Sequence, residues 1–294
     1  MQMLRVRHVT RYRYAKPVRF GEHRMMLRPR EDADQQLLFE RLSITPEPLS
    51  LRIERDGLGN FVAIARFDGA SNELCFDNEL LVARQVESPV FRVPLPGLTP
   101  FPCMSPADLD LGLDAWARRF LGRRETPGLP MIAAMTAYIH RSFSYRRRLE
   151  PGVQSPEHTL ALRSGACRDF AVLICAAART QGLKARFVSG YVHCPLPEDG
   201  PAPTAGGHTH AWAQVLTPEA GWVDFDPTSG RVGPVGLIRL AVADDPAEIV
   251  TIEGAYHGEA ADFLHMHVEV AVEAAPAAFH SPPQFEPLPL WSVA

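Results

Sequence analysis

Residues 164–182 read SGACRDFAVLICAAARTQG, three small residues followed by an apolar segment with helical spacing. Apolar residues three and four positions apart predict a helix from about Cys167 to Gln181, which ends at Gly182. Cys167 begins this helix at one end of its apolar face. Because backbone N–H groups and the helix dipole favour a thiolate there, we expect a lowered thiol pKa. Cys175 lies deep in the same helix and is expected to be inert.

Three β-strands are predicted after this helix, in KARFVSGYVHC (184–194), HAWAQVL (210–216) and GWVDFD (221–226). The last two are joined by TPEAG, a connection short enough for a hairpin. His210 begins the second strand and Asp226 ends the third, so the hairpin can place an imidazole beside a carboxylate. Asp224 points to the same face as Asp226, because alternate residues of a strand share a face, and it is the competing carboxylate.

A cysteine, a histidine and a carboxylate in this arrangement are the groups that nucleophilic acyl transfer requires. The thiolate needs an imidazole as its base, and the imidazole needs a third group to hold its orientation. The order along the chain, from a helix start to neighbouring strands, matches the geometry of papain-like enzymes. The residues alone therefore favour Cys167 and His210 as a reactive pair, with either aspartate as the orienting group.

Four segments, GACRDFAVL, ARFVSGYV, HAWAQV and GWVDFDPTSG, occur in the order and spacing of the bacterial transglutaminase-like superfamily. The chain resembles that family, which includes transglutaminase-like cysteine proteases, most densely from about 138 to 230. The resemblance implies an α+β fold with a papain-like transglutaminase core, in which the helix carrying the cysteine packs on an antiparallel sheet. It also implies Cys167 as nucleophile, His210 as general base and acid, and Asp226 as the orienting carboxylate.

The chain is predicted to have two folded parts and a proline-rich tail. We expect an N-terminal β-rich, sandwich-like domain over 1–100, which ends in a proline-rich linker at 94–106. The catalytic core is expected over 107–235. A C-terminal β-extension over 236–275 is expected to return and pair with the first domain, and 276–294 forms the tail. The N-terminal domain and the C-terminal extension are predicted to contain β-strands because apolar residues alternate with polar ones in both.

Further residues are candidates for the site. The oxyanion hole needs two donors, and we expect the Cys167 backbone N–H as one and Tyr145, in the FSY run, as the other. Substrate-cleft candidates are Trp212, His208 and Asp224. The clustered histidines near 193 and 208 lack a carboxylate or second cysteine at zinc-finger spacing, so we expect no metal, and the chemistry requires no cofactor.

Composition narrows the classes of partner. A formal net charge of −4 argues against a general nucleic-acid binder. The longest apolar run, 171–178, is far shorter than the roughly 20 residues of a bilayer span, so we expect no membrane insertion. The N-terminus lacks the apolar block of a signal peptide and the five cysteines form no CxxC pair, which favours a cytoplasmic protein with reduced thiols.

The predicted function is thiol-dependent acyl transfer on a peptide or isopeptide amide, ending in hydrolysis, with a peptide or protein as substrate. One alternative is a protein-glutamine transamidase, in which an amine replaces water as acyl acceptor. The chemistry before the thioester is the same, so the triad does not distinguish them. Another alternative is a non-catalytic peptide-binding module that retains the residues. The sequence does not indicate an oligomeric state.

Overall fold

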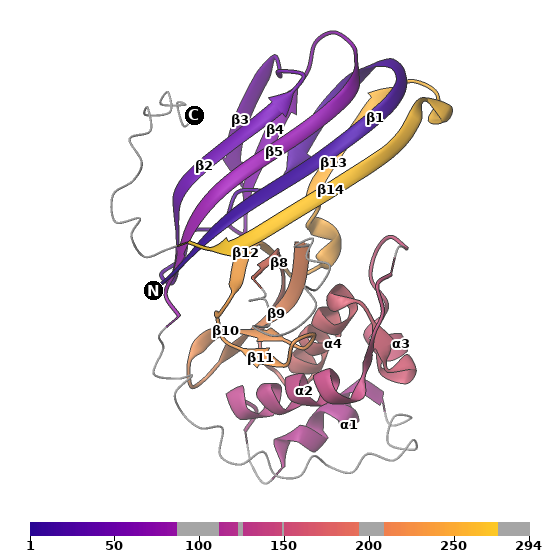
Figure 1. Ribbon diagram of the computed structural model, residues 1–294. Coiled ribbons are helices and arrows are strands. Elements are labelled where there is room, and N and C mark those ends of the chain that lie inside the picture. The colour runs from indigo at the N-terminus through magenta and orange to yellow at the C-terminus, as the bar shows by residue number, and fades with distance from the viewer. Residues whose placement is uncertain (87–111, 123–125, 149, 194–208, 276–294) are drawn as a thin grey trace, which may run out of the picture.

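The computed structural model describes residues 1–86, 112–122, 126–148, 150–193 and 209–275. A strand-rich N-terminal part lies against an α+β core, and the chain's last strands return to the N-terminal part (Figure 1). The predicted linker at 94–106 and the predicted tail at 276–294 lie outside the described residues. None of the helices in the described part of the chain is both long and apolar enough to span a membrane.

The N-terminal part is built around one long strand, β1. Its own strands are β1 (Gln2–Met25), β2 (Gln35–Thr45), β3 (Ser50–Arg55), β4 (Phe61–Arg66) and β5 (Ser71–Arg84). They are arranged in the order β2-β5-β1-β4-β3, and β13 (Ile252–His257) and β14 (Phe263–Ala274) also pair with β1. β3 and β4 are joined by a short connection and pair antiparallel.

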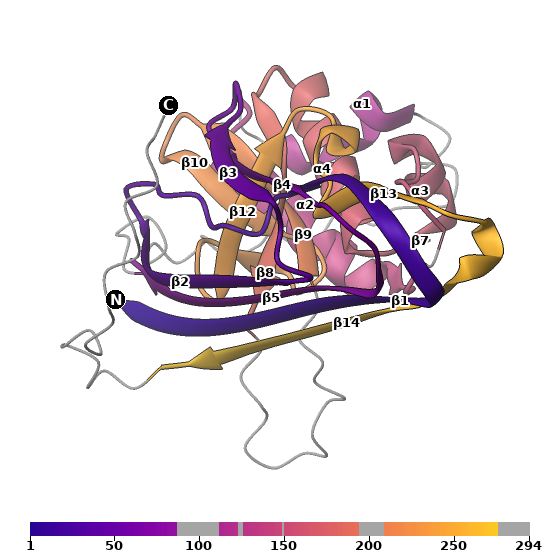
Figure 2. The same ribbon diagram turned by 90° about the horizontal axis from the view of Figure 1, so that it is seen from above.

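β1 belongs to two layers because it changes partners along its length. Its first half pairs with β5 and β14, and its last residues pair with β4 and β13. Seen from above, β2, β5, β1 and β14 form one layer while β3, β4 and β13 lie on the other side (Figure 2). The register shifts between Arg13 and Val18, where Pro17 has no N–H to donate. An apolar cluster with residues from β1, β4 and β5 fills the space between the layers, as in a sandwich.

In the described residues of the core, four helices lie on one side of a five-stranded antiparallel sheet. The helices are α1 (Gly112–Arg118), α2 (Leu129–Ser142), α3 (Pro156–Leu162) and α4 (Cys167–Thr180). The sheet has the order β11-β10-β9-β8-β12, with β8 (Ala185–Val192), β9 (Thr209–Thr217), β10 (Gly221–Asp226), β11 (Arg231–Val232) and β12 (Leu237–Ala243). Two short strands, β6 (Ser144–Tyr145) and β7 (Ser164–Gly165), pair parallel. Short 3₁₀ helices span Arg119–Leu121, Pro246–Glu248 and Ala260–Asp262.

α4 packs on the sheet through the apolar face that its spacing predicts. Phe170, Ile174 and Ala178 are at most 2% exposed and lie in one cluster with Ala213 and Val215 of β9. Burial of this stripe, rather than intrinsic helix propensity, is the main source of stability for a helix of this kind. The helix carrying the cysteine thus packs on an antiparallel sheet, and the predicted papain-like α+β core is confirmed.

The predicted C-terminal extension at 236–275 is divided between the two parts of the molecule. β12 is the edge strand of the core sheet, paired with β8, whereas β13 and β14 pair with β1. The expected pairing with the first domain is therefore made by β13 and β14 but not by β12. The run LIRLAVA of β12 is buried throughout, and a strand that is buried on both faces shows no alternation from which to predict the sheet that it joins.

The two parts share a buried interface. One apolar cluster contains residues from both, namely Leu4, Val6, Leu80, Val82 and Val270 with Tyr191, Ile238 and Leu240. Polar side chains complete the contact, since the Asn60 amide makes two hydrogen bonds to the backbone of Val242, at 2.8 and 2.9 Å. The face of the core sheet opposite α4 is consequently enclosed by the N-terminal part.

Candidate active site

Cys167 is the first residue of α4, and the turn before it is held by a buried aspartate. The carboxylate of Asp169, with no exposed surface, accepts hydrogen bonds from the backbone N–H groups of Ala166 and Gln154, both at 2.8 Å. The Arg148 guanidinium donates to the same carboxylate at 2.7 Å. The loop entering the helix is thus fixed, and the thiol has a defined position.

Sequence reasoning missed Asp169. An acidic residue three positions after the residue preceding a helix is a known signal for a side chain that returns to the helix start. That signal was present in the sequence as Ala166 and Asp169. The contribution of Arg148 comes from another segment of the chain and had no sequence signal.

The surroundings of the Cys167 thiol favour its ionised form. Burial alone would raise the pKa of the thiol, but a hydrogen bond with His210 and the positive charge of that ring lower it. Backbone N–H groups of Ala211 and Arg168 lower it further. The net result is a pKa below the ordinary value of a cysteine, as predicted from the helix start. Cys175 shows the opposite behaviour in the same helix, because complete burial raises its pKa to about 12.

His210, at the beginning of β9, lies between the thiol and a buried carboxylate. Its Nε2 is 3.1 Å from Oδ1 of Asp226, which leaves Nδ1 for Cys167. The distance is that of an ion pair, although the ring N–H is not well aligned on the oxygen, as is common before substrate binds. Burial would lower the pKa of His210, but its contacts with Asp226 and Cys167 raise it to about 10.

Asp226 rather than Asp224 faces the imidazole. Asp226 is fully buried and accepts hydrogen bonds from the Thr228 backbone N–H at 3.0 Å and the Ser229 hydroxyl. Burial raises the pKa of this carboxyl, but His210 and these donors lower it below its usual value, so the group is ionised. The local sequence left the choice between the two aspartates open, and the tertiary structure resolves it.

Tyr145 lies beside the nucleophile, as its proposed role requires. In the parallel β6–β7 pair, Tyr145 is opposite Gly165, two residues before Cys167. The Tyr145 side chain is 55% exposed, and burial together with the negative charge of Cys167 raises the pKa of its hydroxyl. The hydroxyl is therefore neutral and able to donate a hydrogen bond.

Two of the three predicted cleft residues are in the wrong place. Trp212 is fully buried and Asp224 is 3% exposed, so neither lines a substrate cleft. They lie beneath the site because the N-terminal part covers that face of the sheet. His208 lies outside the described residues. Trp222 on β10 is 41% exposed, with the Arg186 guanidinium 4.2 Å from its ring centroid.

Two family models match the two parts of this chain. The transglutaminase-like superfamily model matches residues 114–227, and the bacterial transglutaminase-like N-terminal region matches residues 4–83. The chain therefore has a transglutaminase-like core and a bacterial transglutaminase-like N-terminal region. The matched regions contain α4, β9 and β10 of the core and most of the N-terminal sheet.

Similar proteins are found in several bacteria. This transglutaminase-like chain is 27% identical to an uncharacterized protein of Mycobacterium tuberculosis (strain ATCC 25618 / H37Rv), with 92% of each chain covered. It is 30% identical to a protein-glutamine gamma-glutamyltransferase of Pseudomonas aeruginosa over 113 residues, 35% of this chain and 16% of that protein. A crystal structure named "Putative Cysteine Protease" from Cytophaga hutchinsonii shares the fold, with a TM-score of 0.63, 22% identity and coverage of 92% and 90%.

Proposed function

We propose that this protein is a thiol-dependent acyltransferase that cleaves a peptide or isopeptide amide and ends in hydrolysis. Its triad is Cys167 as nucleophile, His210 as general base and acid, and Asp226 as orienting carboxylate. The observation that supports this most directly is the contact of one buried imidazole with both an acidic thiol and a buried carboxylate. Perturbed pKa values of this kind mark catalytic groups when the geometry agrees.

The mechanism follows from the ionised pair. The Cys167 thiolate attacks the amide carbonyl, and a tetrahedral oxyanion forms at the start of α4. The His210 imidazolium gives its proton to the departing amine, the C–N bond breaks, and a thioester remains on Cys167. The neutral imidazole then takes a proton from water, whose oxygen attacks the thioester. The acid leaves and the thiolate–imidazolium pair is restored, so protons and bonds balance.

A transamidase is the second candidate. In that reaction a primary amine, rather than water, attacks the thioester and forms a new amide. The similarity to the Pseudomonas aeruginosa protein-glutamine gamma-glutamyltransferase favours it, although that similarity covers 35% of this chain. The steps up to the thioester are the same, so both reactions require the same triad.

Mass spectrometry of a peptide library incubated with the protein tests these candidates. We expect shortened peptides in water, with loss of the signal when the triad cysteine is absent. With an added primary amine, mass-shifted adducts on intact peptides would favour transamidation instead. Neither cleavage nor adducts, over a library that includes isopeptide-linked substrates, would contradict both proposals.

The reactivity of the cysteines gives the first prediction. Iodoacetamide at about pH 6 should alkylate Cys167 before the other four cysteines, because its pKa is lowered while that of Cys175 is raised. As the pH falls further, the thiolate is protonated and the rate of alkylation drops. At the other limit, the imidazolium loses its proton near pH 10, so the turnover of substrate should fall there. Peptide mapping by mass spectrometry identifies the labelled residue. Earlier labelling of Cys75, Cys103 or Cys194 would contradict the assignment.

Tyr145 gives the second prediction. If its hydroxyl donates to the oxyanion, Tyr145→Phe should lower kcat by roughly 10²–10³-fold, the usual cost of one lost donor. KM and the alkylation profile of Cys167 should stay unchanged, because the thiol keeps its partners. Tyr138→Phe, a mostly buried tyrosine on α2, is the matched control. Unaltered turnover in Tyr145→Phe would exclude the hydroxyl as the second donor.

A further inference from the structure

The imidazole of His210 contacts both Cys167 and the indole of Trp212. Along β9, Ala211, Ala213 and Val215 point to α4 and pack with its apolar residues. Trp212 alternates with them and therefore points to the opposite face of the sheet, which the N-terminal part encloses. Trp212 accordingly lies in a separate cluster with residues of β8 and β12. Residues that hold Trp212 in place therefore also affect the position of His210, the proposed general base.

The indole of Trp212 is held on three sides. Its ring is stacked on His210, with centroids 6.0 Å apart and planes at 26°. Its Nε1 donates to Oδ1 of Asp224 at 2.8 Å. A Cβ added at Gly190 would lie 2.6 Å from the ring and 1.9 Å from the Ile238 carbonyl oxygen, so only glycine fits there. These contacts hold the indole in one position, in which it packs against the ring of His210.

Asp224 is in turn held by two buried arginines. Its Oδ2 accepts a hydrogen bond from Nη1 of Arg239 at 2.9 Å and lies 3.6 Å from Nη2 of Arg84. The three side chains are at most 3% exposed. Arg84 belongs to β5 of the N-terminal part, so one charge that fixes the carboxylate comes from outside the core.

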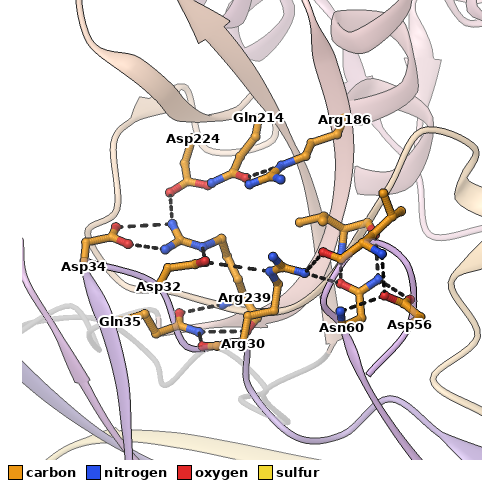
Figure 3. A network of polar contacts seen from close by, with 12 residues as sticks. Arg30, Asp32, Asp34, Gln35, Asp56, Asn60, Arg186, Gln214, Asp224 and Arg239 are labelled. Atoms are coloured by element: carbon orange, nitrogen blue, oxygen red, sulfur yellow. Dashed lines mark hydrogen bonds and ion pairs between the residues drawn. The ribbon is translucent and has the colours of Figure 1, made fainter. Parts of the chain in front are cut away.

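Arg239 is itself fixed by the N-terminal part (Figure 3). Its guanidinium pairs with Asp34 and, at 3.3 Å, with Asp32, and its position between these aspartates and Asp224 is plain in the close-up. Its backbone is also held, since its N–H donates to Oε1 of Gln35 and its carbonyl accepts from Nε2, both at 2.9 Å. The position of Arg239, and with it that of Asp224, therefore depends on contacts with the N-terminal part.

The chemical nature of this interface is informative. Apolar side chains of similar volume would join the two parts at least as well, because burying charges has a large desolvation cost. What a network of directional charged contacts adds is a defined orientation for each member. In this network the last side chain to be oriented is the indole of Trp212, which contacts His210.

We propose that the N-terminal part is a functional component of the active site, which positions His210 through Arg84, Arg239, Asp224 and Trp212. These are positioning residues, because none of them contacts the thiol. The proposal depends on the triad function and adds to it a role for the domain that contributes no triad member. It also explains why Asp224 and Trp212, adjacent to the triad in sequence, are buried rather than open to substrate.

Two variants test the proposal at opposite ends of the network. Trp212→Phe keeps an aromatic ring against His210 but removes the N–H to Asp224, and Arg84→Met removes the charge from the N-terminal part. Each should lower kcat for the chromogenic acyl donor p-nitrophenyl acetate by about 10-fold to 100-fold with KM unchanged, because the base is misplaced. The midpoint of Cys167 alkylation against pH should rise by about half a unit to one unit.

The controls separate positioning from general stability. Arg7→Met removes an ion pair with Asp77 on the outer face of the same domain, where the Arg7 side chain is 64% exposed, and should change neither readout. Melting temperatures define an assay temperature at which every variant is folded. The double variant Arg84→Met/Trp212→Phe should lose no more than the worse single variant, since both act through one chain of contacts.

The outcomes distinguish this proposal from the function on which it rests. Wild-type values of kcat and alkylation midpoint in both single variants would overturn the positioning role while leaving the triad intact. Additive losses in the double variant with an unmoved alkylation midpoint would show a structural role only and would also overturn it. Absence of low-pH alkylation in the wild-type protein would overturn the triad assignment, and the positioning proposal with it.

Discussion

Replacing Cys167 with alanine is expected to abolish acyl transfer, with a fall in kcat of about 10⁶-fold, the scale seen when the nucleophile of a triad is removed. The reason is that no other group can form the thioester on which the proposed mechanism depends. Product formation from the peptide library, followed by mass spectrometry, measures the effect. Cys175→Ala, a cysteine two turns further along α4 whose thiol is fully buried, is the matched control.

The control should retain activity close to wild type, because an inert thiol is removed from the same helix. Intact-mass spectra should also show an acyl adduct on the wild-type protein early in turnover and none on Cys167→Ala. Substantial cleavage by the alanine variant would show that the reaction does not proceed through this thiol, and would contradict the assignment of Cys167 as the nucleophile.

Replacing Asp226 with asparagine is expected to lower kcat by about 10⁴-fold, the effect of the equivalent change in a serine triad. Asparagine keeps the size of the side chain and can still accept from the Thr228 N–H, but it brings no charge to His210. The pKa of His210 should therefore fall, since its contact with Asp226 is one of the causes that raise it. The high-pH limit of activity should move down in the same variant.

Asp245→Asn is the comparison for this change. Asp245 accepts from the Ala247 N–H at the start of a 3₁₀ helix, in the same kind of local turn, and makes no contact with the triad. Its variant should have the kcat and pH profile of the wild-type protein. Equal activity in Asp226→Asn and Asp245→Asn would contradict the orienting role of Asp226 and leave His210 without a carboxylate partner.

Local sequence patterns were sufficient to locate the nucleophile and its imidazole. The spacing of apolar residues after Cys167 predicts the helix that is α4, to within one residue of its end at Thr180. The short connection between β9 and β10 brings His210 and the end of β10 to the same side of one hairpin. Both signals depend on residues close together in the chain, so they can be read without a structure.

Other features of the site had no local signal. Asp224 and Asp226 are equivalent by strand alternation, and only the buried guanidinium of Arg239 shows why Asp224 is not free to face the imidazole. Trp212 was expected in the cleft because it shares the face of His210. The face of the core sheet to which its indole points is enclosed by a domain whose contacting residues precede it in the chain by well over a hundred positions.

The sequence by itself determined the identity of the fold, the helix that presents Cys167, and the hairpin that carries His210 and its carboxylate. The helix and the hairpin follow from periodicity and turn chemistry within short segments, and the fold follows from the resemblance of four motifs to the transglutaminase-like superfamily. The tertiary structure alone decided that β12 belongs to the core sheet and that the N-terminal part encloses the back of the site. It also shows the contact between the imidazole and Asp226, the carboxylate that the resemblance implied. Contacts such as Gln35 with Arg239, 204 positions apart, depend on how whole sheets pack, and no pattern in either segment encodes its distant partner.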